Sequence, residues 1–402
     1  MRYKGPKRIL SLVFALLFFC ALRYNQTSAA GSPLSAEEMA LLAEGRIAYA
    51  RSVKLFAREG DGLFITPPQF SGLPLAAGTI KQNKLEGAAA YLNALRAAAG
   101  LLPLAHSPEL SVEAQHRAVL YAYAALQYPA SDPPQGVDPA FYETATRTKG
   151  GEILYDGNIW DSINRALCEA LPGESACQNR NRLLDPRYTE IGLGQHLDSK
   201  VPSAIQSVHI LNGERQSDCA LVVWPPKGIM PVEALPKDGV MRWSACFLST
   251  YTVTAETRVR VDCLDSGRSW TFGVSAIGGD YAITVSPQQN TVSFLDQTMA
   301  LTQGSVYTIT LFNIKETASG ALHSYQYRTA VQSLAVPYLR GDANTDGVVN
   351  AADAAAILRH LVKLKPLSTD GLCNAMLLPN APVSAVCASK ILRWLVKLEP
   401  EL

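Results

Sequence analysis

Apolar residues recur with a helical period in four stretches of the first half of the chain, and shorter apolar segments follow them. The first stretch opens with Ser35 and Glu38, whose spacing predicts a capping box at a helix start. The later segments are each of strand length. Helices followed by a small sheet predict an α/β/α or α+β sandwich. The predicted helices span residues 35–58, 84–100, 108–126 and 158–171, and the predicted strands span 189–197, 205–211 and 219–224.

Alternation with a period of two replaces the helical pattern after residue 241. It is clearest at residues 258–263, 281–285 and 306–311, and turn dipeptides such as Ser266-Gly267 separate these segments. The pattern predicts an all-β, immunoglobulin-like sandwich of about 100 residues.

The C-terminal part contains an internal repeat and a loop rich in oxygen-bearing side chains. Residues 354–366 recur as 388–400, which predicts two equivalent helices. The loop before the first helix has carboxylate or amide side chains at positions 1, 3, 5, 9 and 12 and glycine at position 6. This pattern indicates an EF-hand-type calcium site, with a simple capped turn as the alternative. The expected calcium ligands are Asp342, Asn344, Asp346, the Val348 carbonyl, Asn350 and Asp353.

The second repeat lacks this ligand set, so we expect one Ca²⁺ ion. Its equivalent positions are Met376, Leu378, Asn380, Ser384 and Cys387. A calcium loop without a preceding helix, followed by a duplicated helix, resembles a type I dockerin over residues 340–402. The resemblance implies calcium-dependent binding to a cohesin domain of a scaffold protein, as in a cellulosome. The contact candidates that it implies are Ala351, Ala352, Leu358 and Arg359, with core packing as the alternative for Leu358.

Motifs in the middle of the chain, taken in order, resemble the CAP superfamily of cysteine-rich secretory and pathogenesis-related proteins. They are Asn93-Ala94-Leu95-Arg96 with the helix after it, Gly151-Glu152, and Asn179-Arg180-Asn181-Arg182 leading into Ile191-Gly192-Leu193-Gly194. The resemblance covers residues 84–232 and implies the same α/β/α sandwich that the residue pattern predicts.

The CAP resemblance also implies a cleft that often holds two histidines and two acids, and here that set is incomplete. Glu152 matches the first acid, but Asn179 and Arg117 stand where the histidines are expected, and His116 lies one position away. Neither an amide nor a guanidinium replaces imidazole as a metal ligand, so metal-dependent hydrolysis is not expected. Glu152 is a weak candidate for a general base, or it pairs with Arg180 to brace the fold.

The start of the chain and its charge indicate where the protein works. Residues 1–30 combine early Lys and Arg residues, an apolar run at 9–22 and small residues at 28–30, the pattern of a signal peptide. The run is too short to cross a bilayer, so we expect export, with a lipid anchor at Cys20 as a minor alternative. A net charge of +1 provides no basic field for nucleic acid.

Export permits disulfide bonds. With Cys20 removed, seven cysteines remain, so at least one stays unpaired. Their positions favour Cys219 as the free thiol and three bonded pairs: Cys168 with Cys177, Cys246 with Cys263, and Cys373 with Cys387. The last bond is expected to close the loop of the second repeat in place of a calcium ion.

Together these features predict an extracellular, scaffold- or cell-surface-associated protein whose function lies in its docking site. The alternatives are a hydrolase, either a protease or a carbohydrate-active enzyme, and an adhesin whose CAP cleft holds a polysaccharide, peptide or lipid. Trp243 and Trp270 either contact carbohydrate or lie in the core, and His196 and His209 are expected to be structural. The predicted divisions are residues 1–30 (signal peptide), 31–83 (helix and irregular segment), 84–232 (CAP), 239–335 (β-sandwich) and 338–402 (dockerin).

Overall fold

The computed structural model describes residues 34–57, 62–124, 133–148, 152–155, 158–168, 177–196, 207–217, 221–236, 239–248, 250–273, 281–286, 290–296, 298–378 and 381–402. The predicted signal peptide, Cys20 and Cys219 lie outside these residues, as does the side chain of Cys168. Within the described ranges, no helix has both the length and the hydrophobicity that crossing a membrane requires.

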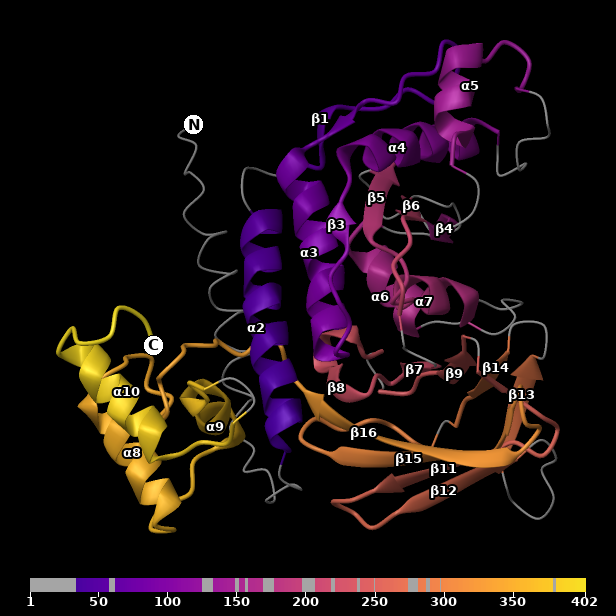
Figure 1. Cartoon of the computed structure of the whole chain (residues 1–402). Helices are drawn as coiled ribbons and strands as arrows, with labels where there is room; N and C mark the ends of the chain where they lie inside the picture. The colour runs from indigo at the N-terminus through magenta and orange to yellow at the C-terminus, as the bar shows by residue number, and fades with distance from the viewer. Residues whose placement is uncertain are drawn as a thin grey trace, which may run out of the picture.

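The first half of the chain is a three-layered α/β/α unit around a sheet with the strand order β3-β5-β6-β4 (Figure 1). Ile191 and Leu193 on β5 face the core that contains α3, whereas Val208 and Ile210 on β6 pack with α4 on the other side. Alternate residues of a strand point to opposite faces, so both faces are covered. The mixed α/β architecture is confirmed. The elements are α2 (Ala36–Ala57), β1 (Phe64–Thr66), β2 (Thr79–Ile80), α3 (Gln82–Ala98), β3 (Ala105–His106), α4 (Pro108–Tyr123), α5 (Pro139–Thr146), β4 (Glu152–Tyr155), α6 (Asp161–Cys168), α7 (Gln178–Leu183), β5 (Glu190–Gln195) and β6 (Ser207–Asn212).

Helix α4 lies directly on β5 because the strand presents glycine to it. A Cβ atom on Gly194 would lie 2.3 Å from the carbonyl carbon of Ala114, which is closer than real Cβ contacts come. At this short separation the Gln115 side chain reaches the strand, where its Oε1 accepts from Gln195 N at 2.8 Å and its Nε2 donates to Gln195 O at 2.9 Å. The glycines of the predicted CAP motif therefore set the distance between helix and sheet.

The N-terminal helix α2 packs along α3 (Figure 1). Its predicted capping box is confirmed, because Ser35 N donates to Glu38 Oε2 at 2.7 Å and Glu38 N donates to Ser35 Oγ at 3.1 Å. Gly87 on α3 allows the close approach, since a Cβ there would meet the backbone nitrogen of Phe56 at 2.8 Å. The helix is thus an integral layer of the α/β/α unit.

The β-rich part is one continuous ten-stranded sheet in the order β7-β9-β14-β13-β12-β11-β15-β16-β8, with β10 paired to β15. We expected β7 and the chain up to residue 232 in the CAP sandwich, but β7 pairs with β9 and β8 with β16. Both strands are mostly buried and belong to the larger sheet. The larger sheet therefore begins before residue 232, where we expected the CAP sandwich to end. The strands are β7 (Leu221–Trp224), β8 (Gly228–Pro231), β9 (Trp243–Phe247), β10 (Tyr251–Thr252), β11 (Arg258–Cys263), β12 (Ser269–Gly273), β13 (Tyr281–Ser286), β14 (Thr291–Phe294), β15 (Val306–Glu316) and β16 (Leu322–Gln332), with a short 3-10 helix η2 (Val232–Ala234) after β8.

Aromatic rings from several strands of this sheet pack together in the core. Trp243 stacks on Phe294 at 5.6 Å, Phe294 stacks on Phe272 at 4.2 Å, and Tyr307 meets Trp243 edge-on at 6.4 Å. Trp243 and Trp270 are both buried. Of the two roles considered for these tryptophans, the structure favours the core.

The C-terminal module, residues 338–402, forms a small core of its own between α8 (Ala351–Leu361) and α10 (Ala385–Leu395), with α9 (Thr369–Ala375) between them in sequence. Helix α9 lies between α2 and the pair α8 and α10 (Figure 1). The buried Arg46 on α2 donates to Asp370 Oδ1 at 2.6 Å and to Ser333 O at 3.1 Å, which joins α2 to α9 and to the end of β16. The module is therefore attached to the body by a defined contact.

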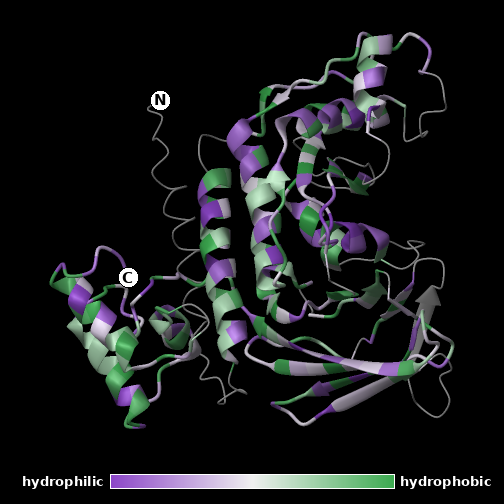
Figure 2. Ribbon diagram, in the orientation of Figure 1, coloured by the Kyte–Doolittle hydropathy of each residue, from purple (hydrophilic) through white to green (hydrophobic). Residues whose placement is uncertain are grey.

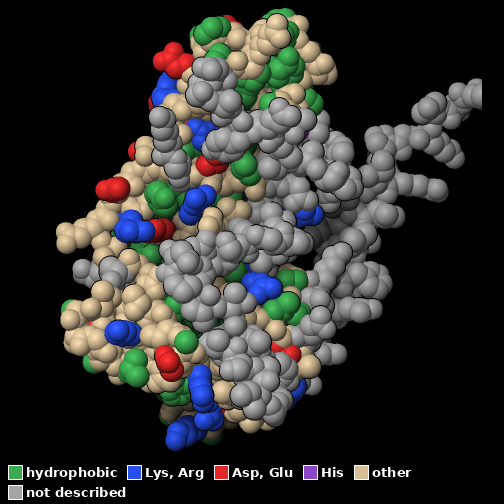
Figure 3. Space-filling model, turned by 90° about the vertical axis from the view of Figure 1, so that its right-hand side faces the viewer, with side chains coloured by type: hydrophobic (Ala, Val, Ile, Leu, Met, Phe, Trp, Pro, Cys, Tyr) green, Lys and Arg blue, Asp and Glu red, His purple; other side chains and the backbone are tan. Residues whose placement is uncertain are grey.

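Charge is spread rather than gathered on the face of the molecule shown in Figure 3. There the described Lys and Arg side chains are distributed from one end of the face to the other, together with acidic and hydrophobic ones. This agrees with the near-neutral net charge of the sequence.

Candidate functional site

The predicted calcium loop folds around two carboxylates. Asp342 accepts hydrogen bonds from the backbone nitrogens of Asp346, at 3.1 Å, and Gly347, at 2.9 Å. Asp353 accepts from Asn344 N at 3.0 Å and from Asn350 N at 2.8 Å. Gly347 has a φ of 87°, a conformation that glycine adopts without strain, so the chain turns there as the EF-hand pattern requires.

The carboxylates of Asp342 and Asp353 are both buried. Asp342 is 4% exposed and Asp353 is fully buried, and neither forms an ion pair with a described residue. A buried charge is costly unless it is compensated, and Asn344, Asp346 and the Val348 carbonyl add further oxygen donors in the same loop. Calcium takes oxygen ligands of these kinds, so the donor set fits this ion.

No group of three or more His, Cys, Asp or Glu side chains comes close enough to share a metal ion anywhere in the described ranges. The fit of the loop to calcium rests on its oxygen donors, which include amide and carbonyl groups, and on the two buried carboxylates. Asn350 also caps α8, because its side chain accepts from Ala352 N at 2.7 Å.

The second repeat has a different helix start. Cys387 occupies the position of Asp353 and is equally buried, and its sulfur lies 3.8 Å from Ser384 Oγ. Ser384 makes no side-chain cap on α10, in contrast to the capping box of Asn350 and Asp353 on α8. An apolar thiol thus replaces the carboxylate at this position.

Two of the expected disulfide bonds, Cys246 with Cys263 and Cys373 with Cys387, are not formed in the structure, where these cysteines are buried and have no disulfide bond. The expected bond between Cys168 and Cys177 lies outside the described residues, because the side chain of Cys168 is not described. Cys373 and Cys387 cannot pair as placed because they belong to different cores: the sulfur of Cys373 lies 3.8 Å from Met39 O on α2, whereas Cys387 packs inside the module. Cys246 and Cys263 likewise lie on β9 and β11, strands that are not neighbours in the sheet.

The repeat divides into buried and exposed pairs of residues 34 positions apart. Ala354 with Ala388 and Ile357 with Ile391 form the module core. The aliphatic pairs that stay exposed are Leu358 with Leu392, Leu361 with Leu395, Val362 with Val396, and Leu364 with Leu398. We call these eight residues the aliphatic face. Leu358, Leu361, Leu392 and Leu395 lie on α8 and α10, and the other four follow the ends of these helices, along which hydrophobic and hydrophilic residues alternate (Figure 2). Leu358 is 45% exposed and is not a core residue, and the contact candidates Ala351, Ala352 and Arg359 are exposed as well.

In the CAP region, Arg117 joins two acids in the interior. Its Nη2 lies 2.5 Å from Glu113 Oε1 and its Nη1 lies 3.4 Å from Glu152 Oε1. Tyr121 donates a hydrogen bond of 2.9 Å to the same Glu152 oxygen. Arg117 and Glu113 are buried, and the side chain of Glu152 is 10% exposed. The position where the CAP resemblance implies a histidine therefore holds a cation shared by two carboxylates.

Two partners in this cluster were missed in the sequence, and one expected pairing is wrong. Glu113, Arg117 and Tyr121 follow one another at intervals of four on α4, a spacing that places them on one face of a helix and could have revealed them. Arg180 does not brace Glu152. It is buried and donates instead to Leu167 O and, at 2.9 Å, to Ser244 Oγ on β9, because α7 faces the larger sheet.

His116 and Asn179, the other positions compared with the CAP cleft, lie outside the Arg117 cluster. His116 Nδ1 is 2.7 Å from Val112 O, and its ring packs against Phe141. Asn179 lies on α7 and is half-buried. Neither residue reconstitutes the histidine pair.

His196 and His209 are buried in the CAP region. His209 Nε2 lies 2.8 Å from Ser162 Oγ, and the His196 ring meets Phe70 edge-on at 5.0 Å. Burial lowers the pKa of each imidazole to about 4, so both are neutral at physiological pH. Their packing supports the structural role expected for them.

The lowered pKa of His209 predicts a loss of stability in acid. Because the folded-state pKa of about 4 lies below the unfolded value of about 6.5, the unfolded chain binds the proton more tightly. The contribution of His209 to the free energy of unfolding should therefore fall by about 3 kcal/mol as the pH drops from above about 6.5 to below about 4. Urea unfolding of His209→Gln should show a shallower pH dependence than wild type. The matched variant His323→Gln, at an exposed position of β16, should keep the wild-type dependence; equal slopes for all three proteins would contradict the account.

Comparison with known proteins bears on one part of the chain. No curated protein matches the sequence. Residues 89–207 match the model of the cysteine-rich secretory protein family, CAP, and this stretch includes Glu113, Arg117 and Glu152. The chain thus contains a CAP domain at residues 89–207.

Proposed function

We propose that this protein is exported and attaches through residues 338–402 to a cohesin domain of an extracellular scaffold, in a calcium-dependent manner. The attached chain presents its CAP domain as a binding module rather than as a metal-dependent hydrolase. The observation that carries the proposal is the aliphatic face, which recurs in both repeats on and just after α8 and α10 and stays exposed in a module that also contains the oxygen-rich loop.

The aliphatic face has the character of a contact surface. Leu358 and Leu392 are 45% and 44% exposed, and Val362 and Val396 are both 65% exposed. Single exposed apolar side chains are common, but eight exposed aliphatic residues in so small a module are unusual, and exposed apolar surface of this kind marks protein interaction sites. A cohesin domain docked there would bury this surface.

The two repeats differ in the charge that they present beside this face. The arginine of the second repeat is neutralised by an ion pair, and within the described residues that of the first repeat is not. Arg393 Nε lies 3.1 Å from Glu399 Oε1, whereas the equivalent Arg359 has no ion pair with a described residue. Arg359, Lys365 and Ala352 also line a cavity of about 420 Å³ next to the calcium loop. These differences favour the first repeat as the main contact, in line with Ala351, Ala352, Leu358 and Arg359 as the contact candidates.

In this proposal the loop ligands Asp342, Asn344, Asp346, Asn350 and Asp353, with the Val348 carbonyl, hold one calcium ion. When bound, the ion supplies the positive charge that the buried carboxylates lack and fixes the loop at the start of α8. The loop residues themselves orient the chain, since Asp353 accepts hydrogen bonds from two separate loop positions.

The CAP domain is proposed to bind rather than to cleave. Oε1 of Glu152 is already engaged by Arg117 and Tyr121, so the only acid carried over from the family pattern is part of a buried cluster. A general base needs a partner within hydrogen-bond reach of the proton it removes. Here the neighbouring groups are a guanidinium and a phenol, which brace the carboxylate.

A calcium titration of the full chain tests the ion-dependent half of the proposal. Calorimetry should detect one site in the wild type and none in Asp342→Ala/Asp346→Ala, because the double variant removes two of the carboxylate ligands. The matched variant Glu399→Ala/Glu401→Ala removes the same charge from the same module outside the loop and should keep the site. Two comparable sites in the wild type, or a site that survives the loop variant, would refute the assignment.

A further inference from the structure

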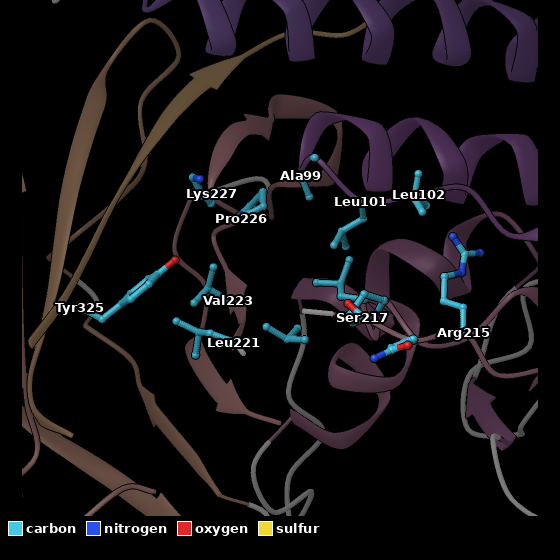
Figure 4. A pocket seen from close by; sticks show the side chains of 15 residues that line it. Ala99, Leu101, Leu102, Arg215, Ser217, Leu221, Val223, Pro226, Lys227 and Tyr325 are labelled. Carbon is cyan, nitrogen blue, oxygen red and sulfur yellow. The ribbon is translucent and has the colours of Figure 1, made fainter. Parts of the chain in front are cut away.

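A cavity of about 460 Å³ lies where the end of α3, the segment after β6, strand β7 and strand β16 meet (Figure 4). Its middle is aliphatic, with Leu101, Leu221 and Val223 between its two ends. Arg215 stands at one end, and Lys227 and Tyr325 stand at the other (Figure 4). The volume is within the usual range for small-molecule sites, and the mixture of apolar walls and few polar groups is typical of them.

The described lining of this cavity has a net positive charge. Among the described residues that line it, Arg215 and Lys227 are charged and none is acidic. Lys227 is more than half exposed and has only a distant ion pair, 3.8 Å, with the exposed Glu37. That contact is worth little in water, so the described lining keeps its net positive charge.

Arg215 is the better placed of the two cations. Its Nη2 donates to Pro103 O at 3.1 Å, but its Nε is buried and has no hydrogen-bond partner among the described residues. A buried donor without a partner is destabilising, and a guanidinium offers a planar fork that matches a carboxylate. Because Arg215 lines this end of the cavity, its guanidinium places a positive charge there that a carboxylate would neutralise.

The surroundings of Arg215 add to the positive potential. Arg96, fully buried nearby, has its pKa lowered to about 10, first by burial and then by the charge of Arg215, against the opposing effect of Asp185. The carboxylate of Asp185 is itself paired with Arg187 at 2.7 Å. Arg96 therefore adds to the positive potential around Arg215.

We propose that this cavity binds a small aliphatic carboxylate, with its acid group at Arg215 and its hydrocarbon part against Leu101, Leu221 and Val223. The aliphatic walls favour hydrocarbon over sugar, since Tyr325 is the one aromatic residue among the described lining. The site lies between the CAP helix α3 and the ten-stranded sheet, apart from the Arg117 cluster and from the C-terminal module. It is independent of the proposed docking function.

Calorimetry of the full chain with octanoate tests this proposal, with octan-1-ol and acetate as companion probes. Octanoate should bind at one saturable site, octan-1-ol should bind at least about tenfold more weakly because it lacks the charge, and acetate should not bind measurably because it lacks the apolar part. This comparison needs no variant. Equal affinity for octanoate and octan-1-ol, or no saturable octanoate binding, overturns the proposal.

The variant Arg215→Gln locates the acid group. It should weaken octanoate binding by about tenfold to a hundredfold, the range for losing a charged hydrogen bond, and should leave octan-1-ol binding unchanged. Arg260→Gln is the matched control. It removes an exposed arginine of β11 that is not among the described residues lining the cavity, and it should bind octanoate as the wild type does. Octanoate binding that is unaffected by Arg215→Gln in a folded protein overturns the assignment of the acid group.

Discussion

Replacing Arg117 with methionine is expected to destabilise the CAP domain by about 3–5 kcal/mol, the range for breaking a buried ion pair by removing one partner. The change leaves Glu113 and Glu152 in the interior without the cation that both contact. It also removes the hydrogen bond from Arg117 Nε to Ala145 O, 2.6 Å, which holds the end of α5. Thermal and urea unfolding of the full chain measure the effect.

Two further variants separate the charge effect from a general loss of packing. Val112→Ala changes an exposed residue of the same helix and should alter stability by less than about 0.5 kcal/mol. Adding Glu152→Gln to Arg117→Met should recover part of the lost stability, because it removes one of the two carboxylate charges. If Arg117→Met lowers the free energy of unfolding as little as Val112→Ala does, the Arg117 cluster does not stabilise the CAP domain.

Replacing both Leu358 and Leu392 with aspartate is expected to lower cohesin affinity by at least about a hundredfold, since truncating central apolar contacts of an interface typically costs 2 kcal/mol or more. Both side chains are nearly half exposed, so the fold and the calcium site should be unaffected. Biosensor binding to an immobilised cohesin measures the change. Of the two single variants, Leu358→Asp should have the larger effect, because Leu358 lies beside Arg359, which has no ion pair with a described residue.

The control for this experiment lies outside the module. Leu322→Asp introduces the same charge at an exposed leucine of β16 and should leave cohesin binding intact. Wild-type affinity in the Leu358→Asp/Leu392→Asp protein would show that the aliphatic face is not the contact surface.

Much of the local structure follows from spacing along the chain. The capping box of Ser35 and Glu38, the helix α3 and the alternating strand β11 all appear where periodicity and end signals predict them. These features depend on neighbours a few residues away, which is the range over which a sequence pattern carries information. The division of the C-terminal repeat into buried and exposed pairs has the same origin.

Contacts between distant segments were harder to predict. A four-residue apolar strand such as β7 fits either sheet, and only the tertiary structure assigns it to β9. Arg180 pairs with Ser244 rather than with Glu152 because α7 packs toward the larger sheet, a relation that no motif records. Cys373 and Cys387 are close in sequence but face different cores, so spacing alone suggested a bond that the packing does not allow.

The central claim is calcium-dependent docking, and retention of the full chain on immobilised type I cohesins tests it most directly. We expect retention by at least one cohesin in calcium, release when EDTA removes the ion, and no retention of Asp342→Ala/Asp346→Ala in either condition. Binding that is indifferent to EDTA, or no binding to any type I cohesin by a protein that holds calcium, would contradict the account.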